Sequence, residues 1–520
     1  MKAEPTTKAK TEQELVRIYM DLTGCTESNA RSVIMLVEPD SQTGQDPGSP
    51  PEPGDRREVV AGQTSAFILA AGILWMFGSV AAAQMNPPQS SPVSTNLLRQ
   101  PISLGQAVDL ALHANPSVLR AQKDVEVTQG VVMQTRAIVL PKAAITGNYS
   151  AVDQASIDKP PGLNFSFGSD QSWRTQFRVV QSIYEGGRMV SALRSARLTT
   201  EQSMLNYRTV LADTIVAVQI SYYDVLLADQ QITVQKASVE LLQSELANTT
   251  RRYDAGTVPR FNVLRAEVEL ANAKPRLIQA QNRFRVSKNV LTTLLGLNLP
   301  PGTGEDIPLQ LSGRLEAEPY DIQLSDALML AFERRSELGS LRKGEALRQE
   351  DVKTARAGYK PSLEAFAGYD IHSSMFSNDL TDQFNGWLAG VQLNWNIFDG
   401  FQTRGKVKQA QALYERAGLE LDDARRRIEL DVRTAFSNFI EAREVLGSTT
   451  KVVEQAEEAV RLAQARNDAG TGTQLDVLSA QTALTDARTT QVQSLRDYEV
   501  ARARLERAVG MNLPETATRD

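Results

Sequence analysis

The chain has 520 residues, 42% of them hydrophobic, which is enough for about two to four ordinary domains. Its net charge of −6 comes from mixed signs and argues against nucleic acid as a partner. One cysteine, Cys25, and two histidines, His113 and His372, exclude an internal disulfide and a Cys/His metal centre. No nucleophile, metal or phosphate-loop motif is present in the sequence, so we expect neither catalysis nor a cofactor.

A signal peptide is predicted over residues 64–83. Ala66–Ala83 is an uncharged run of 18 residues that ends in small side chains, which fits cleavage after Ala83, and Arg56 and Arg57 supply a positive flank. A transmembrane anchor is the alternative, because a run of this length is just long enough to span a bilayer. The small residues and the polar sequence after them favour the signal peptide.

Residues 1–63 are polar, contain several prolines and precede the predicted signal peptide. Because signal peptides begin near the true N-terminus, this stretch is either an over-extended start or a disordered cytoplasmic leader. We assign no function to it, and we expect residues 84–101 to be a linker.

The rest of the chain contains one unit twice. Residues 102–149 align without a gap onto 322–369 at an offset of 220, and from Trp173 onward the offset is 214. An internal repeat of this length predicts two similar units with a linker between them. Their expected bounds are 102–300 and 322–514, with the linker at 301–321.

Each unit is predicted to open with two helices followed by two strands. The first helices span Leu104–Ala114 and Leu324–Arg335. The second helices run to Pro141 and Pro361, since helices stop before a proline. Two-residue alternation of apolar and polar side chains then predicts four strands, at about 143–152, 173–184, 363–372 and 387–398.

The alternation gives each strand an apolar face with aromatic ends and a polar face, as a membrane barrel strand requires. A half-buried strand of a soluble sheet alternates in the same way. The apolar set comprises Trp173, Phe177, Val179 and Ile183 in one strand and Trp387, Ala389, Val391, Leu393, Trp395 and Ile397 in its partner. In a membrane barrel the polar set would line the lumen, or lie at the interface if the two faces are reversed. The lumen is favoured, because an arginine in mid-bilayer lipid costs about 2–4 kcal/mol. This set comprises Arg174, Gln176 and Arg178.

Four strands cannot close a barrel, because no room is left for side chains inside. An open sheet in lipid would leave unpaired edges. If the strands enter a membrane, several copies of the chain must therefore share one barrel. Two copies would give eight strands and a filled interior, and three would give twelve and room for a channel.

A very long helix is predicted after each strand pair. Residues 188–255 contain neither proline nor glycine, which corresponds to on the order of 100 Å of helix. The counterpart spans about 403–469. Two apolar seams run along the first helix, one through Leu211, Ile215, Val218 and Tyr222 and the other through Val216, Ile220, Tyr223 and Leu227. Two seams indicate neighbours on both sides, whereas the alternative is a helix buried in a large bundle.

The long helices end in two similar tips. Residues 253–266 and 467–480 share seven of fourteen residues. Gly256 and Gly470 are suited to ending a helix, and Thr257 or Thr473 to capping the next one. Return helices are predicted over about 263–295, where Pro275 predicts a kink, and 475–509. The complete hairpins would span 188–296 and 403–510.

Together these features resemble the TolC-like family of bacterial outer-membrane efflux proteins, over about 102–514. The strand-to-helix junctions, Ile183-Tyr-Glu-Gly-Gly-Arg188 and Ile397-Phe-Asp-Gly-Phe401, are similar to the family's FDGG signature. The two D-A-G-T…V-L…A tips add to the likeness. The resemblance implies a mixed α/β membrane protein, in which a homotrimer forms a transmembrane β-barrel continued by a long α-helical coiled-coil barrel.

The resemblance also implies a function. The trimer would be the exit duct of a tripartite efflux or type I secretion system, in the outer membrane of a Gram-negative bacterium with a long periplasmic extension. Substrates would pass from an inner-membrane pump of the RND or ABC type through a periplasmic adaptor protein. The alternative is a periplasmic coiled-coil adaptor or scaffold, against which the four amphipathic strands count.

By the same resemblance, the tips hold the pore entrance and the adaptor contacts. The entrance residues would be Asp476, Ser479, Asn262 and Arg265. Three copies of Asp476 would form an acidic ring that attracts cations, although a carboxylate in the first turn of a helix is also favoured by the helix dipole. The adaptor contacts would be Asp254, Gly256, Thr257, Val263, Leu264, Asp468, Gly470, Thr471, Val477 and Leu478.

Overall fold

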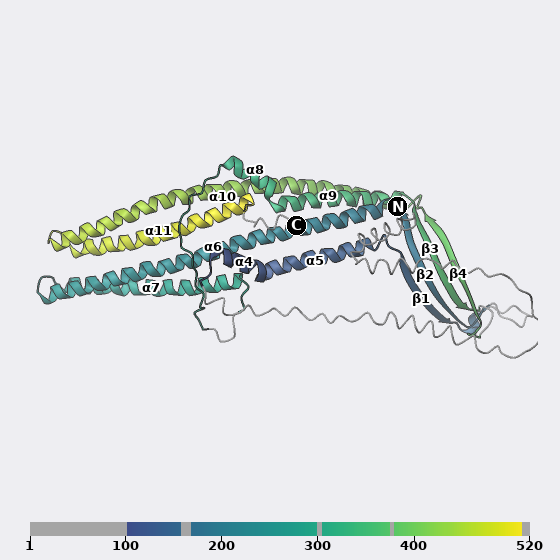
Figure 1. The fold of residues 1–520 in the computed structure, drawn as a ribbon, viewed down its shortest axis with the longest axis horizontal. Helices are drawn as coiled ribbons and strands as arrows, with labels where there is room; N and C mark the ends of the chain where they lie inside the picture. The colour runs from purple at the N-terminus through teal and green to yellow at the C-terminus, as the bar shows by residue number, and fades with distance from the viewer. Residues whose placement is uncertain (1–100, 158–167, 299–303, 375–378, 512–520) are drawn as a thin grey trace, which may run out of the picture. The chain divides into compact units, whose positions relative to one another are not determined.

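The computed structural model describes residues 101–157, 168–298, 304–374 and 379–511. The predicted leader at 1–63 and the signal peptide at 64–83 with its cleavage site lie outside the described residues. The first half has the elements α4 (Leu104–Ala114), α5 (Pro116–Arg136), β1 (Lys142–Ala151), β2 (Gln171–Glu185), α6 (Arg188–Asp254) and α7 (Arg260–Leu294). The second half has α8 (Leu324–Arg334), α9 (Ser336–Arg356), β3 (Ser362–Ser373), β4 (Gln383–Asn394), α10 (Gln402–Asp468) and α11 (Gln474–Val509) (Figure 1).

The second helix of each half ends earlier than the prolines predicted. α5 ends at Arg136 and α9 at Arg356, five residues before Pro141 and Pro361. A short 3₁₀ turn, Ala357–Tyr359, follows α9. Lys360, the residue before the second proline, has φ −105° and ψ 154°. A proline disfavours helical geometry in the residue before it, but it does not make the helix continue up to that residue. Here each proline marks the start of the strand rather than the last turn of the helix.

The four strands form one antiparallel sheet in the order β1-β2-β3-β4. β4 was expected to continue to residue 398, but it ends at Asn394, which pairs with Ser362 at the start of β3. Pro361 precedes Ser362 and has no N–H to donate to a neighbouring strand. Trp395 and Ile397 were therefore wrongly predicted to belong to β4, because β3 has no residues for them to pair with.

The long helices α6 and α10 each contain 67 residues. α6 packs against α4, α5, α7, α9 and α11, so it has neighbours on several sides. Val218 and Tyr222 of its first seam are at most 1% exposed. Among the described residues, α6 alone contains an 18-residue window apolar enough to cross a membrane, and half of that window is buried inside the protein. Helix packing accounts for this apolar composition.

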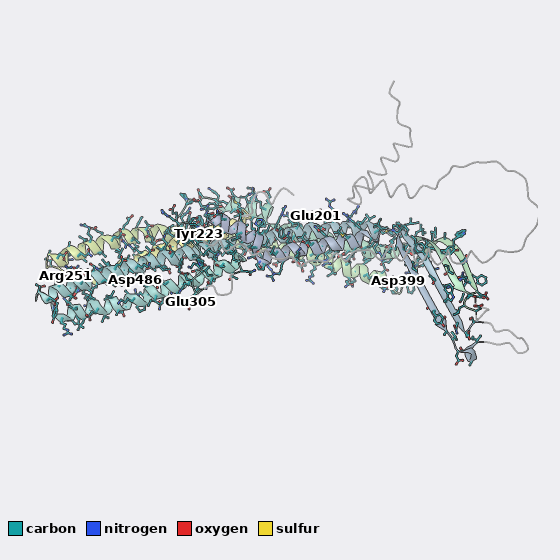
Figure 2. The ribbon with its side chains drawn as sticks, turned by 60° about the horizontal axis from the view of Figure 1, so that its bottom comes forward. Glu201, Tyr223, Arg251, Glu305, Asp399 and Asp486 are labelled. Atoms are coloured by element: carbon teal, nitrogen blue, oxygen red, sulfur yellow. The ribbon has the colours of Figure 1, made fainter. Side chains whose placement is uncertain are left out.

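Left-handed residues connect the sheet to the long helices. Gly186 and Gly187 precede α6 with φ 65° and 99°, and Gly400 precedes α10 with φ 63°. Phe401 occupies the fourth of these positions with φ 69°, although it carries a side chain. The Asp399 carboxylate accepts a hydrogen bond from the Thr403 amide at 2.8 Å, which satisfies a free donor at the start of α10 (Figure 2).

The two hairpin tips begin their return helices differently. α11 starts with a capping box between Thr473 and Asp476, whereas α7 follows Pro259 and has no side-chain cap. Thr257 was predicted as a cap for α7, but its hydroxyl donates to the Arg252 carbonyl at the end of α6 at 2.7 Å. α7 continues as one helix through Pro275.

Candidate functional site: the sheet and the hairpin tips

One face of the sheet exposes a continuous set of large apolar side chains. The strand register aligns Phe177, Tyr369 and Trp387 in one row across three strands. Trp387 is 80% exposed. The other exposed apolar side chains of this face are Ile145, Tyr149, Val391 and Leu393. An apolar surface of this extent indicates a face that contacts lipid or another protein.

More aromatic side chains lie where the sheet meets the helices. Tyr184, Trp395, Phe398 and Phe401 are exposed there, and the rings of Phe398 and Phe401 meet edge to face with centroids 5.6 Å apart. Aromatic residues at both ends of an apolar band are typical of strands that cross an outer membrane.

The opposite face of the sheet is polar. Arg174, Gln176 and Arg178 all lie on it, because they alternate with the apolar residues of β2. Sequence analysis missed Asp370 and His372, although the alternation in β3 places both on this face. Arg174 Nε lies 3.7 Å from one Asp370 carboxylate oxygen, and His372 Nδ1 lies 2.9 Å from the other.

Asp476 is exposed at the second tip and is part of the capping box. Its carboxylate accepts hydrogen bonds from the Thr473 amide at 2.9 Å and the Thr473 hydroxyl at 2.8 Å. These two donors hold the pKa of Asp476 below its ordinary value, so it is ionised at neutral pH. Ser479 is also exposed, whereas Asn262 and Arg265 on α7 are half-buried. No hydrogen bond or ion pair within the described part of the chain joins Asp476 to either α7 residue.

The residues expected to contact an adaptor differ in their exposure, since some are buried and others are exposed. Val477 and Leu478 are 1% and 3% exposed, which corrects the expectation that they face a partner. Leu478 packs against Val239, Leu242, Leu270 and Ala273, and so joins the two hairpins. Val263 is half-buried, and the remaining predicted contacts are exposed, namely Asp254, Gly256, Thr257, Leu264, Asp468, Gly470 and Thr471.

Polar contacts also join the two hairpins near their tips. Gln474 at the start of α11 donates to the Thr249 hydroxyl of α6 at 2.5 Å. Further from the tip, Arg276 of α7 lies 3.9 Å from Asp486 of α11 (Figure 2). Gln481 lies between them along α11, is 2% exposed, and has no hydrogen-bond partner for either amide atom among the described residues. Sequence analysis missed these contacts because each pairs residues more than 200 positions apart.

A partly buried ionic network lies further along α6 and α11. The Tyr223 hydroxyl donates to Glu499 Oε2 at 3.2 Å, and Arg502 donates to Glu318 at 3.2 Å and to Glu506 at 3.1 Å. Burial raises the pKa of the Glu499 carboxyl, and burial together with the Glu499 charge raises the pKa of Tyr223. This network joins the segment between the two halves to the long helices.

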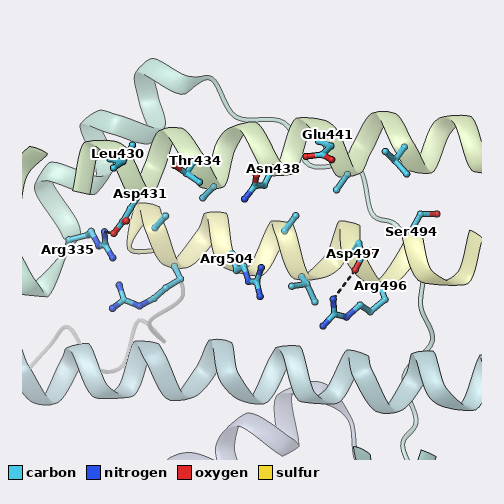
Figure 3. Close-up of a pocket in the computed structure, with 17 residues that line it drawn as sticks. Arg335, Leu430, Asp431, Thr434, Asn438, Glu441, Ser494, Arg496, Asp497 and Arg504 are labelled. Atoms are coloured by element: carbon cyan, nitrogen blue, oxygen red, sulfur yellow. Dashed lines mark hydrogen bonds and ion pairs between the residues drawn. The ribbon is translucent and has the colours of Figure 1, made fainter. Parts of the chain in front are cut away.

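A groove of about 650 Å³ runs between α10 and α11 (Figure 3). Ion pairs line it, with Arg335 3.2 Å from Asp431 and Arg496 2.8 Å from Asp497. Leu430 on its rim is 64% exposed. None of the described residues forms a cluster of three His, Cys, Asp or Glu side chains suited to a metal ion.

The sequence matches the family described as outer membrane efflux protein over residues 107–297 and 327–511. It is 24% identical over 419 residues to the outer membrane protein TolC of Vibrio cholerae, covering 78% of this chain and 90% of TolC. It is also 24% identical over 449 residues to the cobalt-zinc-cadmium resistance protein CzcC of Cupriavidus metallidurans, covering 85% and 98%. The fold is similar to the CmeC outer membrane channel of Campylobacter jejuni, with a TM-score of 0.69, 17% identity and coverage of 80% and 88%.

These similarities confirm the TolC-like resemblance carried by the junctions and the tips. The two matched segments span more than half of the chain. The chain therefore belongs to the outer membrane efflux protein family and is an outer-membrane channel of tripartite efflux or type I secretion systems, with a periplasmic extension.

Proposed function

We propose that three copies of the chain close one channel. Their sheets would form a twelve-stranded barrel in the outer membrane, and their long helices a tunnel in the periplasm. One observation carries this proposal: the sheet exposes an apolar face, has a polar face opposite, and pairs β1 and β4 on one side only among the described residues. Lipid cannot satisfy open strand edges, whereas neighbouring copies can.

The proposed trimer rests on a twofold repeat within each chain. The two units, 102–300 and 322–514, would each contribute two strands and one long hairpin, with 301–321 as the linker. The same order of elements in both halves supports this division, as do the two separate segments that match the family.

An exposed apolar stripe on α10 supports contact between copies. Leu419, Leu430, Val445, Val452 and Leu462 are all more than 40% exposed. At 3.6 residues per turn the five positions lie within about 100° of one another around the helix axis, so they share one face of the helix. The buried residues of α10, including Ile428, Val432 and Phe439, lie on the opposite face. α10 is thus apolar on two sides, and the described part of the chain covers only one of them.

The tips would receive substrate from the inner-membrane pump through the periplasmic adaptor. The exposed tip residues named above are proposed to make this contact, together with Phe261, which is 66% exposed and was missed from the sequence. Three ionised Asp476 side chains would form an acidic ring at the entrance. We propose that the contact of Gln474 with Thr249 and that of Arg276 with Asp486 hold the entrance closed.

Adjacent positions in β4 test the assignment of the two faces. Ala389 lies on the apolar face and Leu388 on the polar face. An arginine at the bilayer midplane costs about 2–4 kcal/mol on the lipid side and little in the lumen. We therefore expect Ala389→Arg to lose most of its outer-membrane trimer and Leu388→Arg to retain it.

The assay is fractionation of cells followed by SDS gels of heated and unheated samples. An equal loss of outer-membrane trimer in both variants would contradict the assignment of the two faces of the sheet. Recovery of the unaltered chain in the soluble periplasm would contradict membrane insertion itself.

A further inference from the structure

Arg178 lies near the middle of the polar face of the sheet. Its guanidinium carbon is 4.6 Å from the centre of the Phe366 ring, on the neighbouring strand β3. Directly opposite Arg178 the register places Ala144 on β1 and Gly368 on β3. Neither neighbour has a polar side chain that could pair with a guanidinium.

Two glycines make room for this arrangement. A Cβ at Gly390 would lie 2.8 Å from Cζ of Phe366, so a larger residue there would displace the ring. A Cβ at Gly368 would lie 2.4 Å from the Phe177 carbonyl oxygen. The ring therefore lies over Gly390 and supports Arg178 by a cation–π contact, which orients the guanidinium without neutralising it.

The other charges of this face lie towards the two ends of the sheet. Asp370 pairs with Arg174 and His372 near the outer end of the sheet. Lys142 and Glu364, which have opposite signs, both lie at the end next to the helices. In the middle, Arg178 makes no hydrogen bond or ion pair with any residue that the structure describes, and its Nε is buried without a partner.

We propose that Arg178 from each copy forms an anion-attracting ring inside the barrel, which selects solutes bearing carboxylate or phosphate groups. This inference rests on the proposed trimeric barrel. A guanidinium with free N–H donors can hold such oxyanions through two parallel hydrogen bonds. The channel would then have charges of opposite sign at its two ends, Asp476 at the periplasmic entrance and Arg178 in the barrel.

The experiment measures current through the purified full-length protein in a planar bilayer, with tripolyphosphate added on the barrel side as the probe. We expect tripolyphosphate to block the unaltered channel. In Arg178→Gln the half-blocking concentration should rise by roughly tenfold, the lower end of the enrichment produced by a cleft of one charge sign. Phe366→Leu keeps the charge but removes the aromatic support, so it should give a smaller rise.

Lys451→Gln is the matched control, because it removes the same charge from an exposed position of α10 far along the helix from the sheet. SDS gels of unheated samples show whether each variant is still a trimer. If Arg178→Gln conducts but is blocked like the unaltered channel, or if Lys451→Gln has an equal effect, the proposed Arg178 ring is contradicted and the proposed barrel is not. If the unaltered chain gives no channels, the proposed barrel itself fails.

Discussion

Glu499 is a buried carboxylate of α11 whose surroundings satisfy only one of its two oxygens. Oε2 accepts from Tyr223, whereas Oε1 is buried without a hydrogen bond among the described residues. Burial raises the pKa of Glu499, and Arg502 at 3.9 Å offsets only part of that effect. A charge held in this way costs stability at neutral pH.

The pH dependence of stability follows from the raised pKa of Glu499. The folded state binds this proton more tightly than the unfolded state, so protonation of Glu499 adds to the stability of the fold. This added stability is fully present below the unfolded pKa of about 4.3 and is lost as the pH rises through the folded pKa. We expect Glu499→Gln to raise the thermal unfolding temperature at pH 8 and to change it little at pH 4. Thermal unfolding at both values measures this.

Glu458→Gln is the matched control for Glu499→Gln. The Arg461 side chain lowers the pKa of this exposed carboxylate. The stability that ionised Glu458 contributes is therefore present above the unfolded pKa and is lost as the pH falls through the folded pKa. The substitution should leave stability at pH 8 unchanged or slightly lower, because exposed ion pairs contribute little. A Glu499→Gln variant that is less stable at pH 8 would mean that the charged form is favoured by the fold.

At the scale of the element, the two return helices differ in how they begin. The Thr473 hydroxyl caps α11, whereas the Thr257 hydroxyl bonds to the end of α6 and leaves α7 without a side-chain cap. Thr473→Ala should therefore weaken the first turn of α11 by about 1 kcal/mol. Hydrogen exchange of the amides at 474–478 should accelerate accordingly.

Thr257→Ala provides the comparison at the first tip. It removes a hydroxyl of the same kind from the first tip, where Pro259 occupies the position that corresponds to Thr473. The first turn of α7 should therefore exchange at an unchanged rate. Equal acceleration at both tips would show that the hydroxyls act on the loops and not on the helix starts.

The elements differ in how far the sequence determines them. The start of α4 and the glycines that end α6 and α10 follow from local rules, and periodicity indicates which face of β2 is polar. The end of β4 could not be predicted, because it depends on Pro361, which precedes the neighbouring strand β3. The burial of Val477 and Leu478 also escaped prediction, since it depends on the packing of α11 against the first hairpin.

At the scale of the whole molecule, the α10 stripe predicts how the trimer responds to charge. Leu430→Glu would place a carboxylate in the proposed contact between copies, where a buried leucine contributes about 1.5–3 kcal/mol. We expect a large loss of SDS-resistant trimer and an unchanged helix content by circular dichroism.

Gln411→Glu adds the same charge to an exposed position of α10 outside the stripe, and the trimer should survive. If Leu430→Glu assembles as well as Gln411→Glu, the stripe does not lie between copies.

The open edges of β1 and β4 have a genetic consequence. In the proposed trimer, β4 of each copy pairs with β1 of the next, so one defective copy leaves sound neighbours with unpaired edges. Consider a chain that still assembles through its helices but carries a proline in β1. In a cell that makes it alongside an equal amount of the intact chain, only roughly one trimer in eight would contain three intact copies. Such an allele is expected to be dominant, whereas a deletion of the gene is expected to be recessive.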